Sequence, residues 1–186
     1  MSETVTATAE LHVNREVERL DRIVGDVLDF ARPLRPDLAP ADVAALVWDA
    51  AGAILHGWEG PHLRVALDPC VGTIVTDAER LRGVLASLLE NARESVHAAG
   101  RTAGVDGIEI GGRRVTSGRL LLWVKDRGAG VAAADLPHVF GLAIARKVVE
   151  ALGGTIRIES REGEGTRVEI ELPAIAPALT PWLTPP

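Results

Sequence analysis

The chain has 186 residues, enough to bury one sizeable core, and its 26 acidic and 20 basic side chains give a formal net charge of −6. Lysine and arginine form no cluster of the kind that nucleic-acid binding requires, so we expect no nucleic-acid partner. The one cysteine, Cys70, lacks a partner for an internal disulfide and lies in no metal-ligand spacing. The sequence shows neither an apolar run long enough to cross a bilayer nor the features of a signal peptide, which predicts a cytoplasmic location.

The first predicted element covers residues 11–32. Apolar side chains recur there at alternating three- and four-residue steps, which predicts an amphipathic helix with a coiled-coil-like seam. Pro33 and Pro36 end it, because proline disfavours helical geometry at the preceding residue and offers no amide donor. Periodicity alone leaves open whether this helix packs on its own domain or forms a dimer.

The remaining elements alternate between helical and strand-like patterns. We expect helices over residues 41–55, 77–99 and 142–152, and strands over residues 63–67, 72–75, 107–115, 120–125, 155–160 and 167–172. This order predicts a mixed sheet covered by helices. We divide the chain into an N-terminal segment with its helix (residues 1–35), one domain (residues 36–174) and an Ala/Pro-rich tail (residues 175–186).

Four short motifs follow one another in this domain. They are Leu-Leu-Glu-Asn-Ala at 88–92, Asp-Arg-Gly-Ala-Gly at 126–130, Gly-Leu-Ala-Ile-Ala at 141–145 and Gly-Glu-Gly-Thr at 163–166. Each alone has an ordinary structural explanation, such as a turn that needs glycine. In this order they resemble the N, G1, G2 and G3 boxes of the ATP-binding catalytic domain of sensor histidine kinases, within the wider group that includes gyrase, Hsp90 and MutL.

The resemblance implies an α+β fold, the two-layer α/β sandwich called the Bergerat fold. Its sheet is mixed but mostly antiparallel and is covered by about three helices. Residues 16–33 also resemble the second helix of the dimerisation and phosphoacceptor hairpin that precedes this domain in many sensor kinases. That likeness favours the dimer-forming interpretation of the N-terminal helix.

Asp126 follows an apolar strand, where its carboxylate can accept a hydrogen bond from an exocyclic amine. Adenine has such an amine where guanine has a carbonyl, so this residue would select ATP over GTP. Gly128 and Gly130 would let the backbone turn tightly and approach the base. The alternative is a surface turn in which the aspartate bonds its own backbone.

The resemblance assigns further roles. Asn91 would hold Mg²⁺ through its side-chain oxygen, and Thr166 would help Asp126 to bind adenine. Where hydrolytic relatives carry a glutamate that activates water, this chain has Ser87, which disfavours an ATPase like gyrase or MutL. No residue is assigned a catalytic role, and the candidate nucleotide-binding residues are Asn91, Asp126, Gly128, Gly130, Gly141, Leu142, Gly163, Gly165 and Thr166.

The implied reaction transfers the γ-phosphoryl group of ATP to a histidine, for relay to a response regulator, with ATP and Mg²⁺ as cofactors. The implied partners are a histidine-bearing phosphoacceptor helix or domain, a response regulator and, in the full-length protein, a second copy of the chain. None of the five histidines has the setting of a phosphoacceptor, so we expect the substrate in trans. The segment that covers the triphosphate in the family is also missing between Phe140 and Gly141, either deleted or left out of the chain.

Two other classes remain open. One is a serine kinase of the anti-sigma-factor type, which shares the nucleotide fold but does not normally carry the helix signature of residues 19–33. The other is a non-catalytic nucleotide-sensing or docking module, which the missing segment and missing phosphoacceptor make plausible.

Overall fold

A computed structural model describes residues 35–55, 63–100, 107–115, 118–132 and 140–174. All of these belong to the unit of the chain that begins at Arg35. The helix predicted over residues 11–32 and the tail from residue 175 lie outside the described residues. In the part that is described, no helix is both long and apolar enough to span a membrane.

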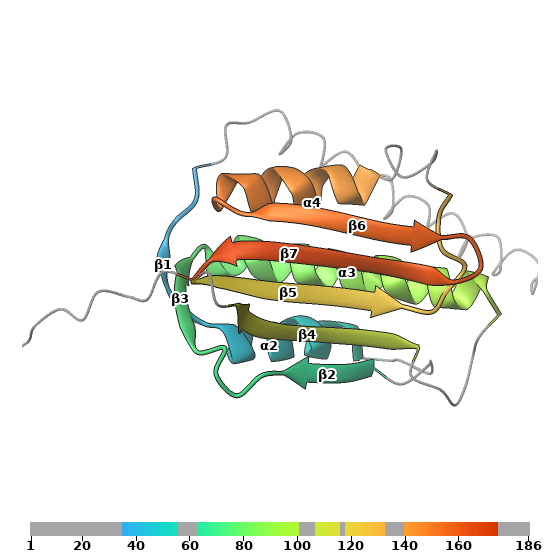
Figure 1. The fold of residues 1–186 in the computed structure, drawn as a ribbon, viewed down its shortest axis with the longest axis horizontal. Helices are drawn as coiled ribbons and strands as arrows, with labels where there is room; N and C mark the ends of the chain where they lie inside the picture. The colour runs from blue at the N-terminus through green and yellow to red at the C-terminus, as the bar shows by residue number, and fades with distance from the viewer. Residues whose placement is uncertain (1–34, 56–62, 101–106, 116–117, 133–139, 175–186) are drawn as a thin grey trace, which may run out of the picture. The chain divides into compact units, whose positions relative to one another are not determined.

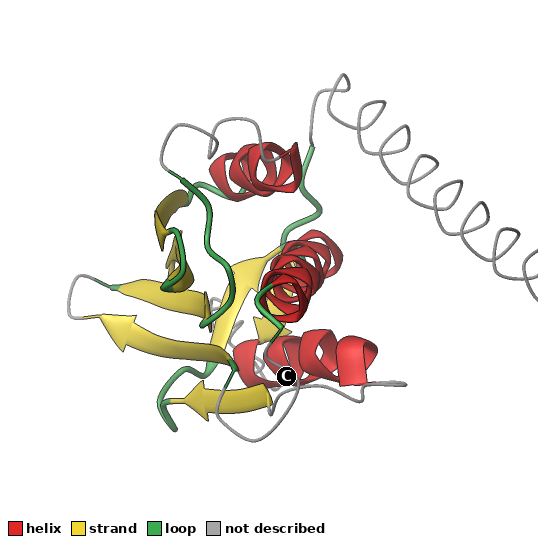
Figure 2. Cartoon of the chain, turned by 90° about the vertical axis from the view of Figure 1, so that its right-hand side faces the viewer, coloured by secondary structure: helices red, strands yellow, loops and turns green. Residues whose placement is uncertain are grey.

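Five strands form the main sheet, in the order β2-β4-β5-β7-β6. They are β2 (Leu63–Leu67), β4 (Ile108–Val115), β5 (Arg119–Asp126), β6 (Thr155–Arg161) and β7 (Gly165–Pro173). β2 pairs with β4 in parallel, and the other neighbours pair antiparallel. The helices α2 (Val43–Leu55), α3 (Ala78–Ala98) and α4 (Phe140–Ala151) cover one face of this sheet (Figures 1 and 2). The predicted α+β sandwich with a mixed, mostly antiparallel sheet is confirmed.

A strand that the sequence did not predict precedes α2. β1 (Ala39–Asp42) pairs antiparallel with β3 (Thr73–Thr76) in a separate two-stranded sheet. The predicted start of the helix at Ala41 is therefore wrong. β1 carries Pro40 and little apolar alternation, and its partner lies far along the chain, so pairing rather than local preference makes it a strand. Asp42 still caps the helix, since its Oδ1 accepts from the Ala45 amide at 2.9 Å.

The core lies between the sheet and α3. The buried side chains of α3 recur at three- and four-residue steps and so form one face of the helix. They are Leu81, Val84, Leu85, Leu88, Leu89, Ala92 and Val96. They face the inner side of the sheet, where every second residue of β5 and β7 is buried. This packing holds α3 against β5, and both elements contribute residues to the candidate site described below.

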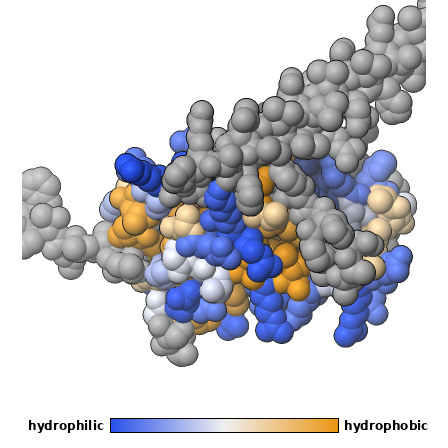
Figure 3. Space-filling model, turned by 90° about the horizontal axis from the view of Figure 1, so that it is seen from above, coloured by the Kyte–Doolittle hydropathy of each residue, from blue (hydrophilic) through white to orange (hydrophobic). Residues whose placement is uncertain are grey.

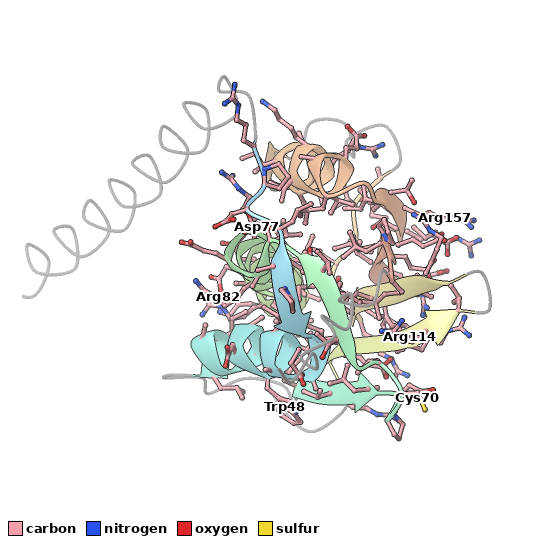
Figure 4. The ribbon with its side chains drawn as sticks, turned by 90° about the vertical axis from the view of Figure 1, so that its left-hand side faces the viewer. Trp48, Cys70, Asp77, Arg82, Arg114 and Arg157 are labelled. Atoms are coloured by element: carbon pink, nitrogen blue, oxygen red, sulfur yellow. The ribbon has the colours of Figure 1, made fainter. Side chains whose placement is uncertain are left out.

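Arg114 of β4 joins the two sheets. Its guanidinium donates to the carbonyl oxygen of Val71 at 2.9 Å and to that of Thr73, the first residue of β3, at 2.9 Å. It also donates to the carbonyl of Ala174, just after β7, at 3.3 Å. One side chain thus links three chain segments that are distant in sequence, at the position labelled in Figure 4.

Asp77 connects the start of the described domain to α3. Its Oδ1 accepts from the Arg80 amide at 3.0 Å, which caps the helix, and its Oδ2 accepts from the Asp37 amide at 3.0 Å (Figure 4). The Arg80 guanidinium lies 3.1 Å from Oδ2. The segment that enters β1 is therefore tied to the same carboxylate that starts the helix carrying Asn91.

We expect Asp77→Ala to lower the free energy of unfolding by about 2 kcal/mol, because a largely buried cap with two backbone donors is lost. Asp42→Ala removes an exposed cap with one described donor and should cost about 1 kcal/mol. Urea denaturation of both variants measures the difference. Equal losses would contradict a role for Asp77 beyond ordinary capping.

Figure 3 shows the domain from above, the side on which α4 and β6 lie in Figure 1. Hydrophilic and hydrophobic residues both appear among the described residues on this face.

Candidate functional site

The site begins with the last residue of β5. Leu120, Leu122 and Val124 are buried on the helix-covered face, and side chains alternate along a strand, so Asp126 points to the same face. Its side chain takes the place of the next core residue, and the residue is only 4% exposed. A carboxylate therefore sits at the end of an apolar row.

Several donors compensate this burial. Oδ1 of Asp126 accepts from the Ser95 hydroxyl at 3.1 Å and from the Gly128 amide at 2.8 Å. The amide and the side chain of Thr166 also hydrogen-bond to the carboxyl group. Burial raises the pKa of Asp126 above its ordinary value, whereas the bonds from Gly128, Ser95 and Thr166 act in the opposite direction.

A pocket lies beside this carboxylate, with about 450 Å³ of empty space that is partly open to solvent. Part of that space is open solvent, and the enclosed part beside Asp126 is small. Its walls come from α3, β5, α4 and β7 and the loop after β5. The lining residues are Leu88, Asn91, Ala92, Ser95, Val124, Asp126, Val131, Leu142, Thr166 and Val168. Four of the predicted residues, Asn91, Asp126, Leu142 and Thr166, thus meet at one apolar cavity that holds a few polar groups.

The predicted glycines lie around this cavity in different ways. A Cβ on Gly128 would meet Ser95, and one on Gly130, where φ is +65°, would meet the carbonyl oxygen of Arg161. Both positions therefore need the close backbone approach that glycine permits. Gly163 differs, since a Cβ there would have nothing within 4 Å. Gly165 approaches the end of β5 closely.

Two serines of the site were not predicted. Ser95 lies four residues after Asn91 and therefore on the same face of α3, a spacing that could have revealed it. Ser160 lies opposite Thr166 in the β6–β7 pairing, and their hydroxyl oxygens are 2.9 Å apart. The Ser160 hydroxyl also accepts from the Val131 amide at 2.8 Å. Each serine thus joins a predicted binding residue to the loop after β5.

Asn91 fits a metal ligand that acts together with a nucleotide. It lines the pocket, and its Nδ2 is buried without a hydrogen-bond partner. Among the described residues, no three His, Cys, Asp or Glu side chains come together as a metal site. A divalent cation would therefore need phosphate oxygens and water besides the amide oxygen, which suits Mg²⁺.

Phe140 and Gly141 are the first two residues of α4 and follow each other directly. Only nine residues separate Gly130 from Phe140 in the sequence. α4 thus begins one residue before Gly141, where the sequence had placed its start, and Leu142 is buried against the pocket.

Comparison with known proteins decides the family. Residues 76–176, more than half of the chain, match the family described as histidine kinase-, DNA gyrase B-, and HSP90-like ATPases. The chain belongs to this family. The predicted resemblance to the ATP-binding catalytic domain of histidine kinases is therefore confirmed.

Individual members of the histidine kinase-like ATPase family support the same assignment. Sensor histidine kinase ZraS of Klebsiella oxytoca is 31% identical over 92% of this chain, and sensor protein ChvG of Rhizobium meliloti is 29% identical over 87% of it. The chain spans only 40% and 33% of their lengths. Full-length ShkA, crystallised in complex with AMPPNP, superposes with a TM-score of 0.73 at 27% identity, covering 88% of this chain and 38% of that one.

Proposed function

We propose that this chain is the ATP-binding catalytic part of a two-component sensor histidine kinase and transfers the γ-phosphoryl group of ATP to a histidine of a partner helix. The observation that carries the proposal is Asp126, a buried carboxylate that lines a mainly apolar pocket open to solvent. The domain would comprise residues 36–174, with residues 1–35 as a dimerisation-type segment. We place it in the cytoplasm, with a response regulator as the final acceptor and a second copy of the chain as a partner.

Each residue would act by position and charge. Asp126 would accept a hydrogen bond from the exocyclic amine of adenine, and Thr166, which bonds to the same carboxyl group, would support that contact. Val124, Val168 and Leu142 would cover the faces of the base. The free amides at the start of α4 suit an anion, so the phosphates would extend toward Gly141.

Asn91 would hold Mg²⁺ through its side-chain oxygen, since it lines the pocket from α3. When bound, the metal ion would neutralise charge on the phosphates. Phosphoryl transfer depends mainly on such charge stabilisation and on the alignment of donor and acceptor. Ser87 is exposed one helical turn before Asn91 and offers no carboxylate to activate water. That arrangement favours transfer to a protein side chain over hydrolysis.

The test is a transfer assay with ATP labelled at the γ-phosphate and a histidine-bearing dimerisation hairpin of a related sensor kinase. We expect label on the hairpin that is lost in acid and retained in base, as for phosphohistidine. A hairpin in which the histidine is replaced by glutamine is the control and should take up no label.

Two other outcomes would contradict the proposal. Acid-stable label on serine would identify a kinase of the anti-sigma-factor type. ATP binding without transfer to any hairpin would identify a nucleotide-sensing or docking module, the alternative that the short sequence between Gly130 and Phe140 makes plausible.

A further inference from the structure

Ser95 contacts two parts of the nucleotide site at once. We propose that Ser95 is a positioning residue, whose hydroxyl holds the Asp126 carboxylate and the loop of residues 128–130 in the arrangement that receives adenine. The inference rests on the proposed function, because it concerns the same pocket. None of the four motifs includes this residue.

The first step concerns the carboxylate. The Ser95 hydroxyl donates to Oδ1 of Asp126 at 3.1 Å, and the Gly128 amide donates to the same oxygen at 2.8 Å. The two donors come from α3 and from the loop. The carboxylate cannot rotate about its Cβ–Cγ bond without losing at least one of them. Its orientation toward a ligand is thus set before the ligand binds, which lowers the cost of binding.

The second step concerns the loop. The Ser95 hydroxyl accepts from the Gly130 amide at 3.4 Å, and the Ser95 carbonyl accepts from the Ala129 amide at 2.9 Å. A Cβ on Gly128 would meet Ser95, so the loop lies directly on this residue. The contact through the carbonyl persists in any side-chain variant. Ser95→Ala therefore removes only the hydrogen bonds of the hydroxyl. The bond between the Ser95 carbonyl and the loop remains.

The third step concerns α3. Ser95 lies one helical turn after Asn91, and its neighbours Ala92 and Val96 are buried in the core at 3% and 0% exposure. The helix therefore presents the candidate metal ligand and the positioning hydroxyl from one rigid surface. A shift of α3 against β5 would change both contacts together.

The distribution of charged groups around Asp126 makes the pH dependence of ligand binding a specific test of the Ser95 hydroxyl. Of the described residues that line the pocket, from α3, β5, α4 and β7 and the loop, Asp126 is the one with a charge. Other charged groups border the adjoining groove on β5, β6 and β7, namely Lys125, Glu159, Arg161, Glu164 and Arg167. None of them is altered in Ser95→Ala, so a change in pH dependence would report the lost hydroxyl.

The experiment measures ATP and GTP binding by calorimetry between acidic and neutral pH, on the wild-type chain, Ser95→Ala and the control Ser87→Ala. Ser87 lies on the same helix and is exposed. For Ser95→Ala we expect ATP affinity at neutral pH to fall about tenfold and preference over GTP to shrink, since a hydrogen bond to a charged group is lost. Affinity should also decline with acidification at a higher pH than in the wild type, because the ionised carboxylate loses a donor. Ser87→Ala should match the wild type.

A second variant separates hydrogen bonding from packing. Ser95→Cys keeps the shape of the side chain but is a weak donor, so it should bind ATP more like Ser95→Ala than like the wild type. If Ser95→Ala bound ATP with the affinity and pH dependence of the wild type, the inference would be overturned. It would also be overturned if Ser95→Ala bound weakly but Ser95→Cys bound with full affinity. Either result would leave the proposed function standing. A wild-type chain that binds no ATP would overturn the proposed function and this inference with it.

Discussion

Replacing Asp126 by asparagine should lower the affinity for ATP by about a hundredfold and leave the domain folded. Asparagine keeps the size of the side chain and an oxygen that can accept from Ser95 and Gly128. It removes the charge, and its amide nitrogen would face the adenine amine as a donor where the carboxylate offers a second acceptor. Calorimetry with ATP measures the loss, and Asp49→Asn, on the exposed side of α2, is the matched control.

The same variant has a predictable effect on stability. Because burial raises the pKa of Asp126, the folded chain holds a proton at pH values where the unfolded chain has released it. The free energy of unfolding therefore falls as the pH rises from the ordinary carboxyl value of 3.8 through the raised value in the fold. At neutral pH the ionised group is a net cost, which asparagine avoids.

Asp126→Asn should consequently be at least as stable as the wild type at neutral pH, with the difference vanishing below pH 3.8. Chemical denaturation at both pH values tests this. A variant that binds ATP poorly because it is unfolded at neutral pH would contradict both expectations. Loss of binding with retained stability would show that the ionised carboxylate contributes to ligand binding and lowers the stability of the fold.

The sequence was informative where a local pattern coincides with a tertiary role. The period of α3 identifies its buried face, and the alternation along β5 predicts that a residue two places after Val124 faces the helices. Local pattern alone is therefore enough to place Asp126 on the helix-covered face of the sheet. The order of the motifs then predicted the family, which single motifs could not have done.

The parts that escaped prediction depend on contacts between distant segments. β1 is a strand because β3 pairs with it, and its own residues carry no strand pattern. Ser95 lies one helical turn after Asn91, but its proposed role depends on contacts that form only when β5 and the loop pack against α3. Gly163 and Gly165 look alike in the sequence, two glycines of one turn, yet their surroundings differ completely.

Gly165 lies in close contact with the end of β5, whereas Gly163 does not. Gly165 has a φ of +98°, and a Cβ there would meet the carbonyl oxygen of Asp126 and lie 2.8 Å from the Cα of Arg127. The turn between β6 and β7 thus packs backbone against backbone on the end of β5. An alanine at this position would be strained and would also displace Asp126, the residue proposed to bind adenine.

We expect Gly165→Ala to reduce the free energy of unfolding by about 3 kcal/mol or more and to abolish ATP binding in the fraction that folds. Gly163→Ala is the matched control, with a φ of +77° but open space around the added Cβ. It should lose only about 1 kcal/mol, from backbone strain, and bind ATP as the wild type does. Denaturation and calorimetry on the pair separate the two causes. Equal losses in both variants would mean that conformational strain alone explains the glycines, whereas binding lost only at Gly165 would show that the turn positions Asp126.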